Sequence, residues 1–108
     1  MKNFDWDLFK NTTYRIAVHC KTKEDAKNFC RMMHEHGLRW CNGNSYLKQN
    51  NYHVYTTKTC YTNKGAYSPY DFYKQNKYII VEYGDFFDTD YIESVEEFIE
   101  RTGRINNL

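Results

Sequence analysis

The sequence predicts one α+β domain built on a mixed or antiparallel sheet of about four strands, with two helices packed on one face. Three observations favour this fold class. A strand, a capped helix and a glycine stop follow one another early in the chain, strand-forming residues come next, and an amphipathic helical pattern lies near the carboxyl end. The 108 residues suit a single domain, 1–108, in which residues 1–12 form an arm or a short helical turn.

The first elements predict a β-α-β beginning. Residues 14–20 alternate Tyr, Ile, Val and Cys with Arg, Ala and His, which is the period of two expected of a strand with one better-buried face. Thr22, followed three residues later by Asp25, resembles a capping box that opens a helix. Gly37 supplies the left-handed stop of that helix. Its apolar stripe consists of Ala26, Phe29, Cys30 and Met33.

The middle of the chain carries strand-forming residues separated by turn signals. Residues 38–41 are expected to form a short strand that ends in a hairpin-like turn at 42–45. Tyrosine, valine and threonine between 46 and 62 predict one or two further strands, interrupted by a loop at 48–51. Residues 62–76 contain glycine and proline and have little periodicity, so they are expected to be the longest loop.

Two more elements complete the predicted fold. Residues 77–83, KYIIVEY, are a near-continuous apolar run, as expected of a central strand that is covered on both faces. Asp88 and Asp90 offer N-caps for a second helix that Gly103 ends. The side chains expected in the core are Phe29, Met33, Ile16, Val18, Ile80, Val95 and Ile99.

Cysteine content and the lack of a targeting signal indicate the compartment. No run of about 18 apolar residues is present, and the first residues lack the apolar stretch of a signal peptide. The sequence therefore predicts a cytoplasmic protein with no membrane span. In that compartment the cysteines are expected to be free thiols that behave as small buried hydrophobes. They are Cys20, Cys30, Cys41 and Cys60.

Catalytic and metal-binding signatures are missing from the sequence. It contains no phosphate-binding glycine loop, no G-x-S-x-G and no H-E-x-x-H, so a non-enzymatic protein without a cofactor is expected. A cysteine with a histidine, such as Cys41 or Cys60 with His19 or His53, is an alternative that needs an activated thiolate. A zinc site is a second alternative, but no C-x-x-C or H-x-x-x-H spacing supports it.

Charge is divided along the chain. Residues 1–81 carry thirteen Lys and Arg against six Asp and Glu, whereas residues 82–100 carry eight acids and no base. Four glutamates of the second predicted helix fall at i, i+3, i+4 and i+7, which gives one acidic face that could occupy a basic, nucleic-acid-binding groove of a partner. A solvated helix exterior is the alternative. The residues predicted to bind that partner are Glu93, Glu96, Glu97, Glu100, Asp85, Asp88 and the aromatic anchors Tyr67, Tyr70, Phe72 and Tyr73.

The segment HGLRWCNGNSY suggests a second kind of site, for a small ligand. It places a cation, two aromatic rings and two amides around a flexible glycine turn, a set that can hold a planar or phosphorylated molecule such as a nucleotide signal. The alternative is that the tryptophan is a core anchor behind an ordinary turn. The residues predicted for this site are Arg39, Trp40, Asn42, Asn44 and Tyr61.

Nucleic-acid binding is a third hypothesis. Basic residues are interleaved with tyrosines before residue 81, and phosphate neutralisation supplies most non-specific affinity for nucleic acid. The basic residues do not form a run, and no recognition helix or RNA-binding signature is visible. Scattered solubilising charge explains the same pattern.

Three segments, FDWDLFKNT, GLRWCNGNSY and TCYTN, resemble small uncharacterised proteins encoded by phages and prophages of Gram-positive bacteria. The resemblance covers most of the chain through the pattern G-x-x-W-C-x-G-x-S followed by T-C-Y. It implies a phage accessory protein acting in the host cytoplasm. Such a context implies an inhibitor of a bacterial defence protein, including a CRISPR effector, and it assigns no functional residue.

Overall fold

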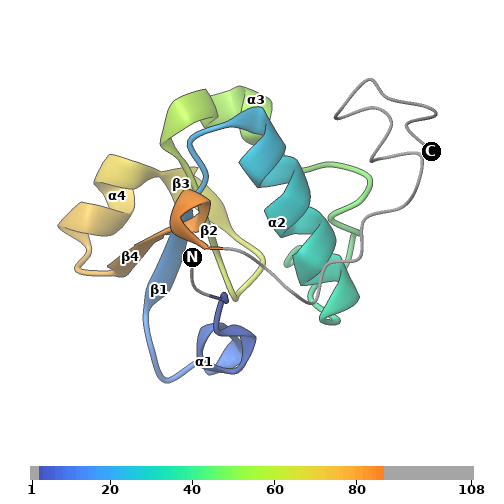
Figure 1. Ribbon diagram of the computed structural model, residues 1–108, viewed down its shortest axis with the longest axis horizontal. Helices are drawn as coiled ribbons and strands as arrows, with labels where there is room; N and C mark the ends of the chain where they lie inside the picture. Colours follow the sequence, from blue (N-terminus) through green and yellow to red (C-terminus); the bar gives the residue numbers. More distant parts are fainter. Residues whose placement is uncertain (1–2, 87–108) are drawn as a thin grey trace, which may run out of the picture.

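A computed structural model of the chain describes residues 3–86. These residues form a four-stranded mixed sheet in the order β3-β2-β1-β4, with helices on both faces (Figure 1). The predicted α+β class and its strand-helix-strand beginning are confirmed. The strands are β1 (Ile16–His19), β2 (Thr59–Thr62), β3 (Tyr67–Pro69) and β4 (Ile79–Glu82). The helices are α1 (Trp6–Lys10), α2 (Lys23–Glu35), α3 (Tyr52–Tyr55), α4 (Tyr70–Gln75), and the 3-10 turns η1 (Thr56–Lys58) and η2 (Tyr83–Asp85).

Strand β1 lies in the interior of the sheet and organises it. It pairs antiparallel with β2, where Val18 lies opposite Tyr61, and parallel with β4, where Val18 lies opposite Val81. All four residues of β1 are buried, so both of its faces are covered. The alternation predicted for residues 14–20 therefore marks two environments and not one buried and one solvated face.

Helix α2 begins and ends as its sequence predicts. The Thr22 hydroxyl accepts a hydrogen bond from the Asp25 amide at 3.0 Å, which satisfies one of the free amides of the first turn. Gly37, at φ +84°, follows the last turn in the left-handed conformation that glycine adopts without strain. The predicted apolar stripe is buried on the sheet, together with Met32.

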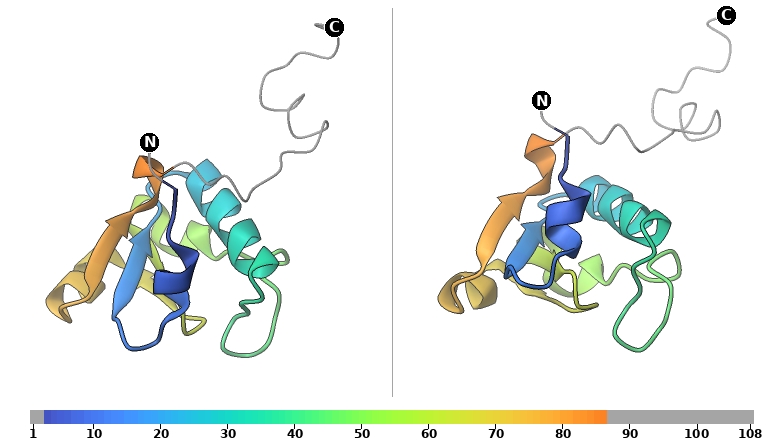
Figure 2. Two further views of the ribbon diagram at one scale, coloured as in Figure 1. Left: turned by 60° about the horizontal axis from the view of Figure 1, so that its bottom comes forward. Right: turned by 90° about the horizontal axis from the view of Figure 1, so that it is seen from below.

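The amino-terminal residues form the ordered helix α1, which covers the same face of the sheet as α2 (Figure 2). The Asp5 carboxylate accepts a hydrogen bond from the Leu8 amide at 2.9 Å and caps this helix. Trp6 stacks on Phe29 of α2 with the ring centroids 5.3 Å apart, and Phe9 meets the same ring edge to face. This aromatic contact explains why so short a helix is held in place.

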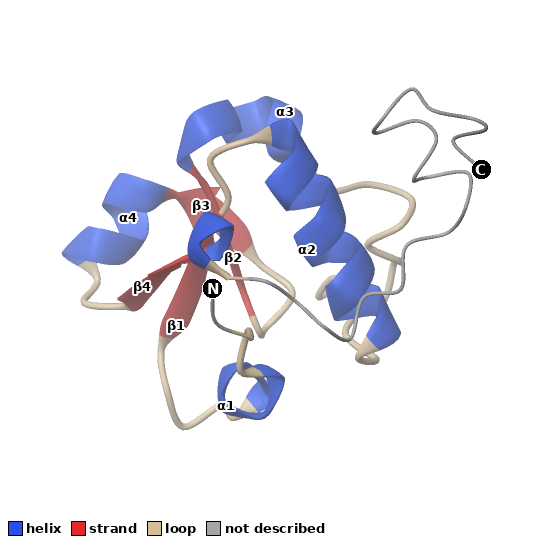
Figure 3. Ribbon diagram, in the orientation of Figure 1, coloured by secondary structure: helices blue, strands red, loops and turns tan. Residues whose placement is uncertain are grey.

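Helix α4 covers the opposite face of the sheet (Figure 3). Its Tyr73 is only 3% exposed and packs in a small cluster with Ala17 of β1 and Cys60 of β2. The sheet is therefore a middle layer between a large aromatic core and a smaller cluster. Of the two helices expected on one face, α2 packs on the main core, and the other lies outside the described residues; α4 is a further helix on the second face.

Two expectations for the middle of the chain are wrong, and a third, one or two strands between 46 and 62, is met by β2 and not by residues 52–55. Residues 38–41 form no strand, because the Trp40 amide donates to Asn44 within its own loop. Residues 52–55 form the helical turn α3, which starts where the Asn50 side chain accepts a hydrogen bond from the Tyr52 amide. Residues 62–76, predicted as a loop, contain β3 and α4, which are too short to show periodicity.

Strand β4 is present where the apolar run predicts it, but its position in the sheet differs. In the sheet formed by residues 3–86, β4 is a terminal strand, and Ile79 is 55% exposed. Ile80 is half-buried against the smaller cluster, so it belongs to the second face and not to the main core. Phe29, Met33, Ile16 and Val18 are buried as predicted. The second predicted helix, with Val95 and Ile99, lies outside the described residues.

Between residues 3 and 86, no helix combines the length and apolar character that crossing a bilayer requires.

Candidate functional site

The loop between α2 and α3 is held by its own hydrogen bonds. The Trp40 indole Nε1 donates to the Gln49 carbonyl at 2.8 Å, across the neck of the loop. At its tip, the Gly43 amide donates to Trp40 at 2.7 Å, and the Trp40 amide donates to Asn44 at 3.0 Å. Gly43 has φ +87°, as the predicted turn requires. The loop is therefore a defined structure that can present side chains in fixed positions.

Gly65 joins this loop to the turn between β2 and β3. The Cys41 amide donates to the Gly65 carbonyl at 3.2 Å. A β-carbon at position 65 would lie 2.3 Å from the Cys41 nitrogen, so the two backbones approach more closely than any other residue allows. Gly65 also has φ +72°. The close approach fixes the distance between the two walls of the cavity described next.

A cavity of about 400 Å³ lies between the loop and this turn. We call it the aromatic cavity, and its defining residues are Trp40, Asn42, Asn44, Lys48, Gly65 and Tyr67. Trp40 is 8% exposed and packs on Tyr46 and Tyr67, with ring centroids 4.5 and 5.5 Å away. Trp40 is thus both a core anchor and a wall of the cavity. The Asn42 carboxamide oxygen accepts a hydrogen bond from the Asn44 amide at 3.0 Å, which orients this rim.

Three of the five residues predicted for a ligand site, Trp40, Asn42 and Asn44, line this cavity. The other two do not. The Arg39 guanidinium turns back on the carboxyl end of α2, where it donates to the Leu38 carbonyl at 2.7 Å and to the His34 carbonyl at 3.4 Å. Tyr61 is fully buried, and its hydroxyl donates to the Asn50 carbonyl at 2.6 Å. Direct contact of Tyr61 with a ligand is therefore a wrong prediction.

A second cavity, of about 510 Å³, adjoins the first. We call it the basic cavity, and its defining residues are Lys27, Arg31, Tyr46, Lys48, Asn50 and His53. Lys48, Gln49 and Asn51 line both cavities, so the two are neighbours separated by this segment. Sequence reasoning missed this site. The one signal in the sequence was the i, i+4 spacing of Lys27 and Arg31, which places both on one side of α2.

The four predicted aromatic anchors have different environments. Phe72 is 49% exposed, whereas Tyr73 is buried in the smaller cluster and cannot contact a partner, which corrects its assignment. Tyr67 is half-buried and lines the aromatic cavity. Tyr70 is half-buried, with its ring centroid 5.0 Å from that of His19. Asp85 is exposed in η2, while Asp88, Glu93, Glu96, Glu97 and Glu100 lie outside the described residues.

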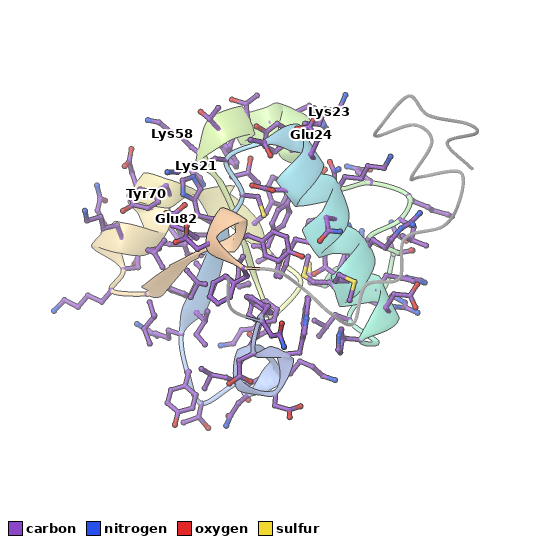
Figure 4. The ribbon with its side chains drawn as sticks, in the orientation of Figure 1. Lys21, Lys23, Glu24, Lys58, Tyr70 and Glu82 are labelled. Carbon is purple, nitrogen blue, oxygen red and sulfur yellow. The ribbon has the colours of Figure 1, made fainter. Side chains whose placement is uncertain are left out.

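A polar cluster at the carboxyl ends of β1 and β4 contains His19, Glu82 and Lys21. Figure 4 labels Glu82 and Lys21 of this cluster. His19 Nδ1 lies 2.9 Å from a Glu82 carboxylate oxygen, and its Nε2 lies 2.7 Å from the Thr57 carbonyl. The Thr57 carbonyl can only accept, so Nε2 donates to it, while Nδ1 faces the Glu82 carboxylate. Lys21 Nζ lies 3.9 Å from the other Glu82 oxygen. The cluster ties β1 to β4 and to η1 and leaves neither ring nitrogen open to a substrate.

The buried cysteines lack the features of a nucleophile. Cys20, Cys30 and Cys60 are free and buried as predicted, whereas Cys41 is exposed. Cys60 lies opposite His19 in the sheet, but burial raises the pKa of its thiol to about 12, and the nearby Glu82 carboxylate adds to this. Burial likewise raises the pKa of Cys30 to about 12. At neutral pH both groups are thiols, and it is the thiolate that attacks electrophiles.

Among residues 3–86, histidine, cysteine, aspartate and glutamate nowhere gather in threes with metal-binding geometry.

Comparison with protein-family models, with curated proteins and with solved structures finds no match to this chain.

Proposed function

We propose that this protein is a non-enzymatic binding protein that sequesters a small planar ligand, such as a nucleotide signal, in the aromatic cavity. The observation that carries this proposal is the concave site of about 400 Å³ in which Trp40 and Tyr67 form apolar walls and Asn42 and Asn44 form a polar rim. Ligand sites commonly combine apolar walls with a few placed polar groups. The cavity is preformed by hydrogen bonds and by the Gly65 contact, which lowers the entropy lost on binding.

Asn44 gives the cleanest test of this proposal. Its side chain is exposed at the rim, and its backbone bonds to Trp40 and to the Asn42 side chain do not depend on the carboxamide. We expect a mono-, di- or cyclic nucleotide at 100 times its dissociation constant to stabilise the native protein by about 2.7 kcal/mol. Asn44→Ala should reduce this stabilisation without changing the melting temperature of the free protein. Differential scanning fluorimetry measures both quantities.

Asn3→Ala is the matched control, because Asn3 is an exposed asparagine in the segment before α1. It should bind the nucleotide as the native protein does. If no nucleotide raises the melting temperature of the native protein, or if both variants bind equally well, the aromatic cavity is not the binding site. Trp40→Ala is unsuitable here, since it would remove a core side chain.

A second candidate function is a phage inhibitor that blocks a bacterial defence protein, such as a CRISPR effector. The structural observation that favours it is Phe72, a large aromatic side chain that is 49% exposed on α4, with the acidic Asp71 beside it. Exposed aromatics commonly anchor interfaces. The glutamates of residues 93–100 supply the second part of this hypothesis through their spacing in the sequence.

Reversing the charge of Glu96 and Glu97 to lysine tests the inhibitor hypothesis. The double variant should fail to protect phage against a host that carries the defence system, with an unchanged melting temperature. Phe72→Ala should weaken protection in the same assay, and Leu8→Ala, which truncates another exposed apolar side chain, should not. Full protection of the phage by the double variant would show that the acidic face is not needed for inhibition.

A further inference from the structure

We propose that the basic cavity binds the phosphate group of the ligand whose planar part occupies the aromatic cavity. This inference rests on the proposed function and adds the chemical class of the ligand, a phosphorylated one. It also assigns the role of phosphate-binding cation to lysines in place of Arg39, because the Arg39 guanidinium donates to backbone carbonyls at the end of α2. Three features of the basic cavity support it: the orientation of the segment between the cavities, the charge of the walls, and the continuity of the two sites through Lys48.

The segment between the cavities is fixed by two buried rings. The Gln49 carbonyl accepts the Trp40 indole hydrogen at 2.8 Å, and the Asn50 carbonyl accepts the Tyr61 hydroxyl hydrogen at 2.6 Å. In a trans peptide the N–H points opposite to the carbonyl of the same plane, and the described residues contain no cis bond. The amides of Asn50 and Asn51 therefore point away from the rings, toward the outer side of the segment.

Within residues 3–86 the structure shows no acceptor for the N–H of Asn50 or of Asn51. Asn50 is half-buried and Asn51 is 9% exposed. Asn51 holds a left-handed conformation, φ 60° and ψ 13°, which turns the chain sharply at this point. Successive outward N–H groups at such a turn form a concave donor surface that favours oxyanions.

The walls of the basic cavity supply positive charge from two elements. Lys27 is exposed on α2, and Lys48 is exposed before the fixed segment; His53, which follows the segment, is also exposed and adds a ring N–H donor. Arg31 forms part of the same wall. Among the described residues that line the cavity, none is aspartate or glutamate, so the field inside it favours an anion. The amides and the ammonium groups together match the several acceptor oxygens and the double charge of a phosphate better than a carboxylate.

Lys48 connects the two cavities. It lines both of them, as do Gln49 and Asn51. A ligand with a planar group against Trp40 can therefore extend past Lys48 and place its phosphate near Lys27. In this arrangement the fixed segment positions both halves of one molecule.

Isothermal titration calorimetry with adenosine 5′-monophosphate, adenosine and inorganic pyrophosphate tests the inference. We expect the monophosphate to bind at least about tenfold more tightly than adenosine, because each charge-assisted hydrogen bond contributes a factor of this order. Lys27→Gln and Lys48→Gln should each remove about tenfold of the affinity for the monophosphate, and Lys27→Gln, which lies outside the aromatic cavity, should leave the affinity for adenosine unchanged. Lys74→Gln is the matched control, since Lys74 is an exposed lysine on α4 on the other face of the sheet.

The possible outcomes separate the two proposals. Equal affinity for adenosine and its monophosphate, or full affinity in the double variant Lys27→Gln/Lys48→Gln, overturns the phosphate site and leaves the aromatic cavity in place. Binding of pyrophosphate that requires Lys27 and Lys48, with no binding of adenosine, supports the phosphate site and counts against the aromatic cavity. If none of the three probes binds, both proposals fail.

Discussion

Gly65 is the residue at which the loop between α2 and α3 comes closest to the turn between β2 and β3. Two constraints meet there, a left-handed backbone and a Cys41 nitrogen 2.3 Å from where a β-carbon would be. The first could be relieved in many loops by a small local change. The second could be relieved only by separating two backbone segments, and these segments form the walls of the aromatic cavity.

Gly65→Ala should therefore destabilise the protein by at least about 2 kcal/mol, since it adds a backbone clash to the strain of positive φ. Gly43→Ala is the matched comparison, because Gly43 also has positive φ but a β-carbon there would meet no atom within 4 Å. It should cost about 1 kcal/mol. Urea unfolding followed by circular dichroism measures both. Equal costs would show that the contact with Cys41 is not a constraint.

Tyr61 positions the segment between the two cavities through one hydroxyl. Tyr61→Phe removes the hydrogen bond to the Asn50 carbonyl and leaves the ring in the core. It should lower the free energy of unfolding by about 1 kcal/mol and weaken binding of adenosine 5′-monophosphate, because the outward amides lose their fixed orientation. Tyr14→Phe, at an exposed tyrosine, is the control for both measurements. Unchanged affinity for the monophosphate in Tyr61→Phe would show that the Tyr61 hydroxyl does not contribute to binding.

At the scale of elements, α2 carries the strongest local signals in the chain. Its cap, its apolar stripe and its glycine stop all agree, and the helix contributes both core side chains and Lys27 of the basic cavity. By contrast, α3 and α4 lack such agreement in sequence. Tyrosine and valine at 52–55 favour a strand, yet hydrogen bonds made by the preceding asparagine start a helical turn.

Thr22→Ala should cost about 1 kcal/mol of stability, because the Asp25 amide loses its capping partner. Thr12→Ala, at an exposed threonine before β1, should change stability by less than about 0.5 kcal/mol. Thermal and urea unfolding of the two variants give the difference. A loss in Thr22→Ala no larger than that in Thr12→Ala would mean that water caps the helix equally well.

At the scale of the whole molecule, the sheet separates two cores, and each contains a buried thiol that makes the stability of the protein depend on pH. Burial raises the pKa of Cys30 in the main core and of Cys60 in the smaller cluster to about 12, from an ordinary value of 9.0. Above pH 9 the unfolded chain releases these protons while the folded chain keeps them. The folded state then binds more protons than the unfolded state, so stability falls as pH rises.

We expect the free energy of unfolding to decrease between about pH 9 and pH 12 by up to about 1.4 kcal/mol per pH unit for each buried thiol. Cys30→Ala should reduce this slope, although it also lowers stability at neutral pH. Urea unfolding at a series of pH values gives the slopes, and an identical slope in native protein and Cys30→Ala would contradict the assignment.

Much of the fold could be predicted because its signals are local. The strand at 16–19, the cap and stripe of α2 and the loop at 48–51 each depend on residues a few positions apart. The grouping of Trp40, Asn42 and Asn44 along one cavity was predicted for the same reason, since the three residues are close together in the sequence. The prediction of a strand at 38–41 was wrong because the Trp40 amide donates to the Asn44 carbonyl within the loop. Strand propensity does not account for such a hydrogen bond.

The sequence by itself determined the α+β class, strand β1, helix α2, the burial of Cys20, Cys30 and Cys60, and the turn that carries Asn42 and Asn44. Only the tertiary structure decided which tyrosines are exposed, since Tyr73 is buried by Ala17 and Cys60, residues far from it in the chain. It also brought Lys27 beside Lys48 and His53. The physical reason is that caps and periodicity act within one or two turns of chain, whereas burial and the charge of a cavity depend on what packs against it.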